Sequence, residues 1–275
     1  MAIVMNLLCQ GVALMELDEH LYKLMASHAA RVTVEQVCMG LRYTAVTTSD
    51  GGIGLAYTYH QPKRSAAMPS TYIDYEGRPA MTLLEKIKSD QPLERSQALA
   101  LINALNYGQA LRLPEDPNNR ILYKTFGLQA GCRVAMVGYF GPLVTYLRKQ
   151  KAALEIIDLG RGLGDKTQFY KKLNAWADVL LLTATSLLNG TTEEIVGHAR
   201  HTVKIVMLGP STPMVADAFR HLPIQMFAGT VPINKAQVLK AIRHGMGTRV
   251  IHRFSKKAYW LTGKSESRAS VSSGD

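Results

Sequence analysis

The chain has 275 residues, of which 47% are apolar and 19% charged, and its formal net charge is +11. This apolar content supplies a packed core and excludes wholesale disorder, while the length favours two domains. The positive charge is scattered along the chain, and no nucleic-acid-binding motif accompanies it. We therefore interpret it as a solvated basic surface and expect no nucleic-acid partner. Its one modest cluster comprises Arg249, Arg253, Lys256 and Lys257.

Sequence signals predict a cytoplasmic protein. The apolar first fifteen residues lack a basic segment and are followed at once by Glu16, Asp18 and Glu19, which argues against a secretory signal. No stretch is apolar for long enough to cross a bilayer. The cysteines stand far apart without a Cys-x-x-Cys pair, so we expect reduced thiols rather than disulfides or a thiolate zinc site. They are Cys9, Cys38 and Cys132.

The N-terminal half predicts a small α+β unit. Its predicted elements are a helix to about residue 30, a hairpin of strands 41–48 and 53–59, and helices at 80–88 and 93–105. In the first helix, leucines recur on one face as Leu14, Leu17, Leu21 and Leu24. The hairpin is indicated by the two β-rich runs on either side of Asp50-Gly51-Gly52.

The C-terminal half alternates short apolar runs with amphipathic stretches. The runs are 133–137, 154–159, 179–183, 203–208 and 224–227, and the stretches are 143–150, 169–177, 193–201, 214–222 and 235–244. Buried strands that alternate with helices predict a parallel sheet with helices on both faces. The proline- and asparagine-rich segment 113–119 is the expected linker. It divides the chain into an α+β domain at 1–115, a Rossmann-like α/β domain at 116–262 and a serine-rich, disordered tail at 263–275.

Ligands of such sheets bind outside the carboxyl ends of the strands, so the candidate site lies just after the apolar runs. After the first run, glycines let the backbone approach a ligand, and Pro142 opens a helix whose free N–H groups attract anions. The alternative is a plain tight turn, since the spacing is not Gly-x-Gly-x-x-Gly. Asp158 ends the second run, where dinucleotide-binding proteins place the acid that holds a ribose. The candidate residues after the first run are Gly138, Tyr139, Phe140 and Gly141.

Hydroxyl and amide groups follow the third and fourth runs. After the third, the capping-box spacing of Thr191 and Glu194 offers a structural explanation for part of the pattern. After the fourth, hydroxyls stand between two prolines ahead of a predicted helix, whose N-terminus suits a carboxylate or phosphate. A rigid N-cap turn is the alternative there. The candidate residues are Thr183, Thr185, Asn189, Thr191, Gly209, Ser211 and Thr212.

The sequence contains no recognisable catalytic or metal-binding motif. His198 and His201 lie three apart on a predicted helix, but neither a cysteine nor a His-Glu-x-x-His pattern accompanies them. We therefore expect exposed histidines at the end of a helix. A Gly-x-Ser-x-Gly elbow and a Walker loop are also absent from the sequence, so no catalytic residue and no metal ligand are assigned.

Several motifs together resemble the two-domain family described as "Putative heavy-metal chelation". The segments that carry the resemblance are 40–46, 98–105, 137–144, 189–191 and 208–214. The resemblance implies an enolase-N-terminal-like first domain, a Rossmann-like second domain and a cleft between them that Asn103 would reach. Gly141 stands where the family pattern has a bulkier residue, often proline, and segment 244–247 is less glycine-rich than that pattern.

These observations lead to the hypothesis that the chain binds a small anionic or metal-chelating metabolite in the interdomain cleft, with processing of that metabolite left open. A metal ion would arrive with the chelating ligand, because the strand-end loops lack clustered histidine and cysteine. Two alternatives are a nucleotide- or S-adenosylmethionine-dependent transferase that uses Asp158, and nucleic-acid binding through the basic C-terminal segment. A second copy of the chain, in a homo-oligomer, is a further expected partner.

Overall fold

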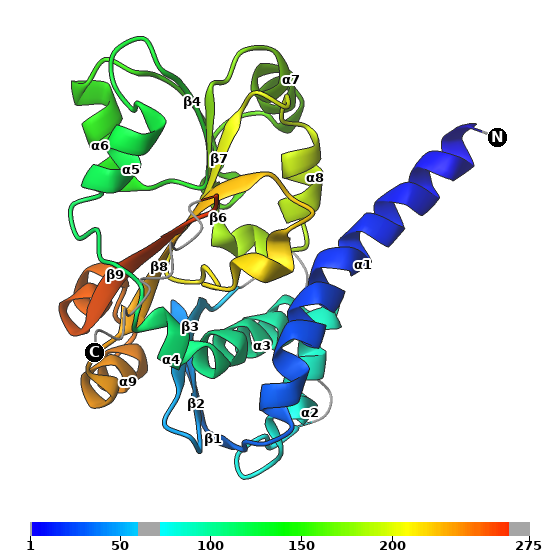
Figure 1. Cartoon of the computed structure of the whole chain (residues 1–275), viewed down its shortest axis with the longest axis vertical. Coiled ribbons are helices and arrows are strands. Elements are labelled where there is room, and N and C mark those ends of the chain that lie inside the picture. Colours follow the sequence, from blue (N-terminus) through cyan, green and yellow to red (C-terminus); the bar gives the residue numbers. More distant parts are fainter. Residues whose placement is uncertain (1, 60–71, 264–275) are drawn as a thin grey trace, which may run out of the picture.

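The computed structural model describes residues 2–59 and 72–263, and it describes side chains from residue 16 onward. It contains a three-stranded antiparallel sheet and a six-stranded, mostly parallel sheet. The smaller sheet packs against helices in the lower part of Figure 1, and the larger sheet with its own helices stands above it. The fold is thus a Rossmann-like α/β unit preceded by a smaller α+β unit, as predicted.

The N-terminal unit contains the predicted hairpin and one strand more. Strands β2 (Tyr43–Thr48) and β3 (Ile53–Tyr57) pair antiparallel across the turn at Gly51, whose φ of 88° suits glycine. Strand β1 (Val34–Met39) was not predicted separately, and it pairs with β2. The helices are α1 (Ala2–Ala29), α2 (Ala80–Leu84) with the 3₁₀ segment Glu85–Lys88, α3 (Pro92–Leu105) and α4 (Tyr107–Ala110).

Helix α1 turns a slightly different face to the core than the leucine spacing predicts. Leu17 and Leu21 are buried, but Leu24 is 42% exposed. The buried row continues instead through Met25 and Ala29, in steps of four residues. Such a row winds around the helix axis, so Leu24 comes to the edge of the buried face. The side chain of Leu14, like that of Cys9, lies outside the described part.

Helix α3 lies unusually close to the hairpin. A Cβ atom at Gly54 would stand 2.1 Å from the carbonyl oxygen of Ala100 and 2.2 Å from the amide nitrogen of Ala104. The glycine therefore lets the backbone of β3 contact the helix directly. On the helix side, Leu99, Leu101 and other residues of α3 are fully buried, so this contact forms the centre of the N-terminal core.

The large sheet contains all five predicted strands and one more. Its order is β5-β4-β6-β7-β8-β9, and only β9 runs antiparallel to its neighbour. The strands are β4 (Arg133–Val137), β5 (Ala153–Ile157), β6 (Val179–Thr183), β7 (Lys204–Leu208), β8 (Ile224–Pro232) and β9 (Ser255–Leu261). The helices are α5 (Arg120–Phe126), α6 (Gly141–Lys149), α7 (Lys166–Ala175), α8 (Thr192–Gly197), α9 (Lys235–Arg243) and α10 (Thr248–Ile251).

Two helix predictions in this half were wrong in extent. The stretch 214–222 forms only the 3₁₀ segment η4 (Ala216–Phe219), because the carbonyl of Met214 instead accepts a hydrogen bond of 2.8 Å from the Asn106 side chain. Helix α8 ends at Gly197, which explains why His198 and His201 lie exposed beyond it, as predicted. Glycine disfavours continuation of a helix.

The basic cluster is only partly a solvated surface. The Lys256 ammonium donates hydrogen bonds to the carbonyls of Leu111 and Leu113, at 2.6 and 2.9 Å. The Lys257 ammonium donates to the carbonyl of Pro117 at 2.9 Å, and burial lowers its pKa. Two of the four basic residues thus fasten the linker to β9. The domain boundary at 115/116 stays a prediction, and the tail from residue 264 lies outside the described residues.

The two units share a packed interface. Helix α9 of the C-terminal unit packs on β1 and β2, where Val238 and Ile242 join a core cluster with Cys38 and Tyr43. The Tyr43 hydroxyl also shares a hydrogen bond of 2.5 Å with the hydroxyl of Thr248. Cys38 and Cys132 are free thiols, as predicted, and burial raises the pKa of both.

Candidate functional site

The carboxyl ends of three adjacent strands bring several predicted site residues together. Strand β6 lies between β4 and β7, so the loops that follow these three strands are neighbours. A Cβ atom at Gly138, after β4, would stand 3.0 Å from the Cβ of Thr183, at the end of β6. A Cβ at Gly209, after β7, would stand 3.8 Å from the Phe140 ring. Gly138, Phe140, Thr183 and Gly209 therefore form one group, which we call the strand-end site.

Both glycines of this site have a backbone that suits glycine alone. Their φ angles are 85° at Gly138 and 119° at Gly209. A side chain at either position would be strained, and at Gly138 it would also crowd Thr183. Beside them, the hydroxyls of Thr183 and Thr185 lie 3.0 Å apart. The N–H groups of both glycines already donate to backbone carbonyls, at 2.8 and 3.1 Å, so the two hydroxyls are the polar groups that this arrangement presents.

The N-terminal unit meets the sheet at the loop after β7. The Ser211 hydroxyl accepts a hydrogen bond of 2.8 Å from the Tyr57 backbone N–H. The Asn103 amide donates to the carbonyl of Leu55 at 2.8 Å and, at 3.4 Å, to that of Ser211. Asn103 and Ser211 thus lie at the contact between the two units, where their polar atoms link the units. Thr212 beside them is buried, and its hydroxyl has no hydrogen-bond partner among the described residues.

Two expectations about capping after these strands were wrong. Thr191 precedes α8, but its hydroxyl donates to the side chain of Asn189 at 2.7 Å and makes no capping bond. Glu194, the expected partner in the capping box, pairs with Lys166 at 2.7 Å instead. The loop from Gly209 to Pro213 does not open a helix, since η4 begins only at Ala216. An anion at that loop would therefore not contact a helix N-terminus.

Asp158 holds two loops together. Its carboxylate accepts the backbone N–H of Tyr139 at 3.0 Å and that of Arg161 at 3.2 Å. The Arg161 guanidinium lies 3.4 Å away and also stacks over the Tyr139 ring. Gly141 begins α6 next to Tyr139, and a Cβ there would stand 3.8 Å from that ring. A role for Asp158 in holding a ribose stays a prediction, and such a ligand would compete with these bonds.

Two surface hollows lie outside the strand-end site. One, of about 410 Å³, is lined by η4, the start of β8 and the end of β9. The other holds about 10 Å³, roughly room for one water molecule, between α1, α3 and the segment before α8. Neither hollow is lined by Gly138, Thr183 or Gly209.

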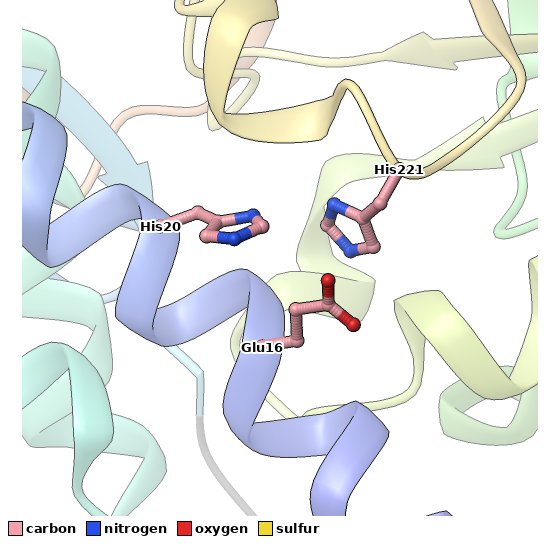
Figure 2. A group of neighbouring side chains, drawn as sticks. All are labelled: Glu16, His20 and His221. Carbon is pink, nitrogen blue, oxygen red and sulfur yellow. The ribbon is translucent and has the colours of Figure 1, made fainter.

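A second group of chemically active side chains was missed by the sequence reasoning. Glu16 and His20 of α1 and His221, which follows η4, point toward one another in Figure 2. A carboxylate oxygen of Glu16 and one nitrogen from each histidine lie within 4.8 Å of one another. The only signal in the sequence was the spacing of Glu16 and His20, four residues apart on a predicted helix. Nothing in the sequence indicated that His221 would join them.

A fourth side chain, that of Glu193, contacts His221 of this group. Its carboxylate lies 3.0 Å from Nε2 of His221. Burial raises the pKa of Glu193, and the His221 imidazole opposes that effect. Nδ1 of His221 is also buried and has no hydrogen-bond partner in the described part of the chain. The His20 and His221 rings meet edge to face, with centroids 4.9 Å apart.

Fold and site together define a two-unit α/β protein whose candidate binding groups lie at the strand ends and where α1 meets the larger unit. A family model described as "Putative heavy-metal chelation" matches residues 122–261, and a second model with the same description matches 22–106. The chain belongs to this family. No curated protein matches the chain. Among the described helices, none combines the length and apolarity needed to cross a membrane.

Solved structures support the fold. The chain is similar to a protein from Pyrococcus horikoshii, with 20% identity, a TM-score of 0.73 and coverage of 89% of this chain and 99% of that one. It is also similar to a protein from Desulfitobacterium hafniense, with 18% identity, a TM-score of 0.70 and coverage of 88% and 99%. Both are described as having unknown function, and both belong to the family whose model matches 122–261.

Proposed function

We propose that the chain binds a small anionic or metal-chelating metabolite at the strand-end site, beside the contact between its two units. The observation that carries the proposal is the grouping of Gly138, Thr183 and Gly209, with two positive-φ glycines next to a hydroxyl. Threonine hydroxyls are suitable donors for carboxylate or phosphate oxygens, and glycine at position 138 leaves the space beside the Thr183 hydroxyl free of a side chain. The position agrees with the rule that α/β sheets bind ligands at the carboxyl ends of their strands.

The family description supports a link with metals but names no ligand. The strand-end site itself contains neither histidine nor cysteine, so a metal bound there would be coordinated chiefly by the ligand. The chain would then recognise the outer oxygens of a chelate. Ser211 and Asn103 would shape one wall of this site, because they tie the loop after β7 to the N-terminal unit.

Native mass spectrometry with elemental analysis of freshly purified protein tests the proposal, followed by titration with citrate and with phosphate. We expect a bound organic anion, with or without a metal, or an unfolding midpoint raised by one of the two probes. Thr183→Val should weaken this binding because it removes a donor while keeping the shape. Thr202→Val, at the opposite ends of the strands, is the matched control and should leave binding unchanged.

A wild-type protein that carries no bound mass and responds to neither probe would refute the proposal. An adenosine-containing mass without metal would instead favour the transferase, provided that Asp158→Ala abolishes its binding. Equal binding by wild type and Thr183→Val would place the ligand elsewhere on the molecule.

A further inference from the structure

We propose that Glu16, His20 and His221 form a binding site for a divalent transition-metal ion of the Zn²⁺, Co²⁺ and Ni²⁺ class. Two imidazoles and one carboxylate are a donor set that these ions accept. The three donor atoms already lie within 4.8 Å of one another (Figure 2). This site is separate from the strand-end site and does not depend on the function proposed there.

The required movement is small. Zinc binds histidine nitrogen at about 2.0–2.1 Å, which puts the ligand atoms of a tetrahedral site roughly 3.4 Å apart. Starting from separations of up to 4.8 Å, each pair of donors needs to approach by at most about 1.4 Å. Glu16 is exposed and can turn freely, whereas the two histidines are half-buried and His221 is held by Glu193. Three protein ligands leave the remaining position to water or to an incoming chelator.

His221 is held as a metal-binding histidine is usually held. Metal-bound histidines direct their second ring nitrogen to a carboxylate or a carbonyl, which fixes the ring. The Glu193 carboxylate contacts Nε2 of His221 at 3.0 Å, and the buried Nδ1 has no partner among the described residues. A polar atom that is buried and unsatisfied is costly, so a ligand that used it would remove that cost.

The ligands come from two parts of the fold. Glu16 and His20 lie on α1, which precedes and joins the N-terminal unit, while His221 belongs to the Rossmann-like unit. Helix α1 packs on η4 and on α8, so the site lies where the two units meet. A bound ion would therefore fasten α1 to the larger unit and would raise the unfolding temperature of the chain.

Zinc titration of the full chain without a polyhistidine tag tests this inference, by isothermal calorimetry and by elemental analysis after dialysis. We expect about one zinc per chain, and no comparable binding of Mg²⁺, which prefers oxygen ligands. Glu16→Gln, His20→Gln and His221→Gln should each weaken zinc binding by more than the roughly 10- to 100-fold lost when an outer-shell partner is removed. The double variant His198→Gln/His201→Gln is the matched control and should bind as wild type does.

A second measurement on the wild type keeps the proposal testable if a variant does not fold. In the NMR spectrum, zinc should shift the imidazole signals of two of the eight histidines, and comparison with His20→Gln identifies one of them. Thr183→Val should retain zinc binding, so loss of the strand-end ligand and loss of the metal site are distinguishable. Absence of zinc uptake by wild type, or unchanged uptake by both histidine variants, would overturn the inference.

Discussion

Arg95 of α3 makes several buried polar contacts, one of which crosses to the other unit, and its removal gives a quantitative test of them. Its guanidinium binds both carboxylate oxygens of Asp18 on α1, at 2.6 and 2.8 Å. It also donates to the carbonyl of Leu187 in the Rossmann-like unit at 2.6 Å and to that of Ile87 at 2.5 Å. Arg95 is 7% exposed, so these bonds are shielded from water. One side chain thus connects α1, α3 and the segment before α8.

We expect Arg95→Ala to lower the free energy of unfolding by about 3–5 kcal/mol, the usual cost of removing one partner of a buried ion pair. The substitution leaves the Asp18 carboxylate and the carbonyls of Leu187 and Ile87 without this donor. Arg220→Ala is the control, because its ion pair with Asp217 is exposed and should contribute less than about 1 kcal/mol. Urea unfolding at pH 7, followed by circular dichroism, measures both changes.

The pH dependence distinguishes a lost ion pair from a merely damaged core. Burial raises the pKa of Asp18, and Arg95 opposes this rise. Removing Arg95 raises that pKa further, so the folded variant binds a proton more readily than its unfolded chain does. The stability lost in Arg95→Ala should therefore shrink as the pH falls through the range where Asp18 is protonated. A loss no larger than that of Arg220→Ala, or one independent of pH, would refute this reasoning.

Two further predictions concern the backbone and a partly buried histidine. Gly54→Ala should lower the free energy of unfolding by about 3 kcal/mol or more, because its Cβ would overlap the α3 backbone at 2.1 Å. Gly51→Ala has open space around it and should lower the same free energy by roughly 1 kcal/mol, the cost of its positive φ. Thermal unfolding of the two variants measures both changes. Burial lowers the pKa of His252 to about 4, below its ordinary 6.5, so stability should fall as the pH drops from about 6.5 toward 4. His252→Gln should weaken that pH dependence, and equal slopes for variant and wild type would exclude His252 as its source.

The sequence predicts the parallel strands well because their signal is local. Strands β4 and β6 coincide with the apolar runs 133–137 and 179–183, and both are buried between layers of helices. Strand β9 begins with Ser255, Lys256 and Lys257, so its apolar run is short, and the two ammonium groups donate hydrogen bonds to carbonyls in or near the linker. A strand whose polar groups are satisfied by distant backbone does not show as a strand in the local pattern.

The candidate sites, like the strands, could be predicted only as far as local pattern and sheet topology determine them. The strand-end grouping of Gly138, Thr183 and Gly209 follows from topology, because adjacent parallel strands end at one edge of the sheet. His221 lies about 200 positions from His20 and follows a segment that was predicted to be a longer helix than it is. Had that helix extended over 214–222, its last turn would have included His221. Segment η4 instead ends at Phe219, so His221 lies in the loop beyond it, where its imidazole faces α1 (Figure 2).

Helix α1 therefore has two roles that the sequence alone does not separate. Asp18 extends from it to Arg95, and Glu16 and His20, on the neighbouring turns, extend toward His221. Residues two apart on a helix point about 200° apart, whereas residues four apart lie on one face, so the ion pair and the histidine cluster use different faces of the same two turns. The ion pair fixes the position of α1 against α3 independently of any metal. The Glu16–His20 face is consequently held against the loop of His221 before an ion arrives, which reduces the ordering that metal binding would otherwise require.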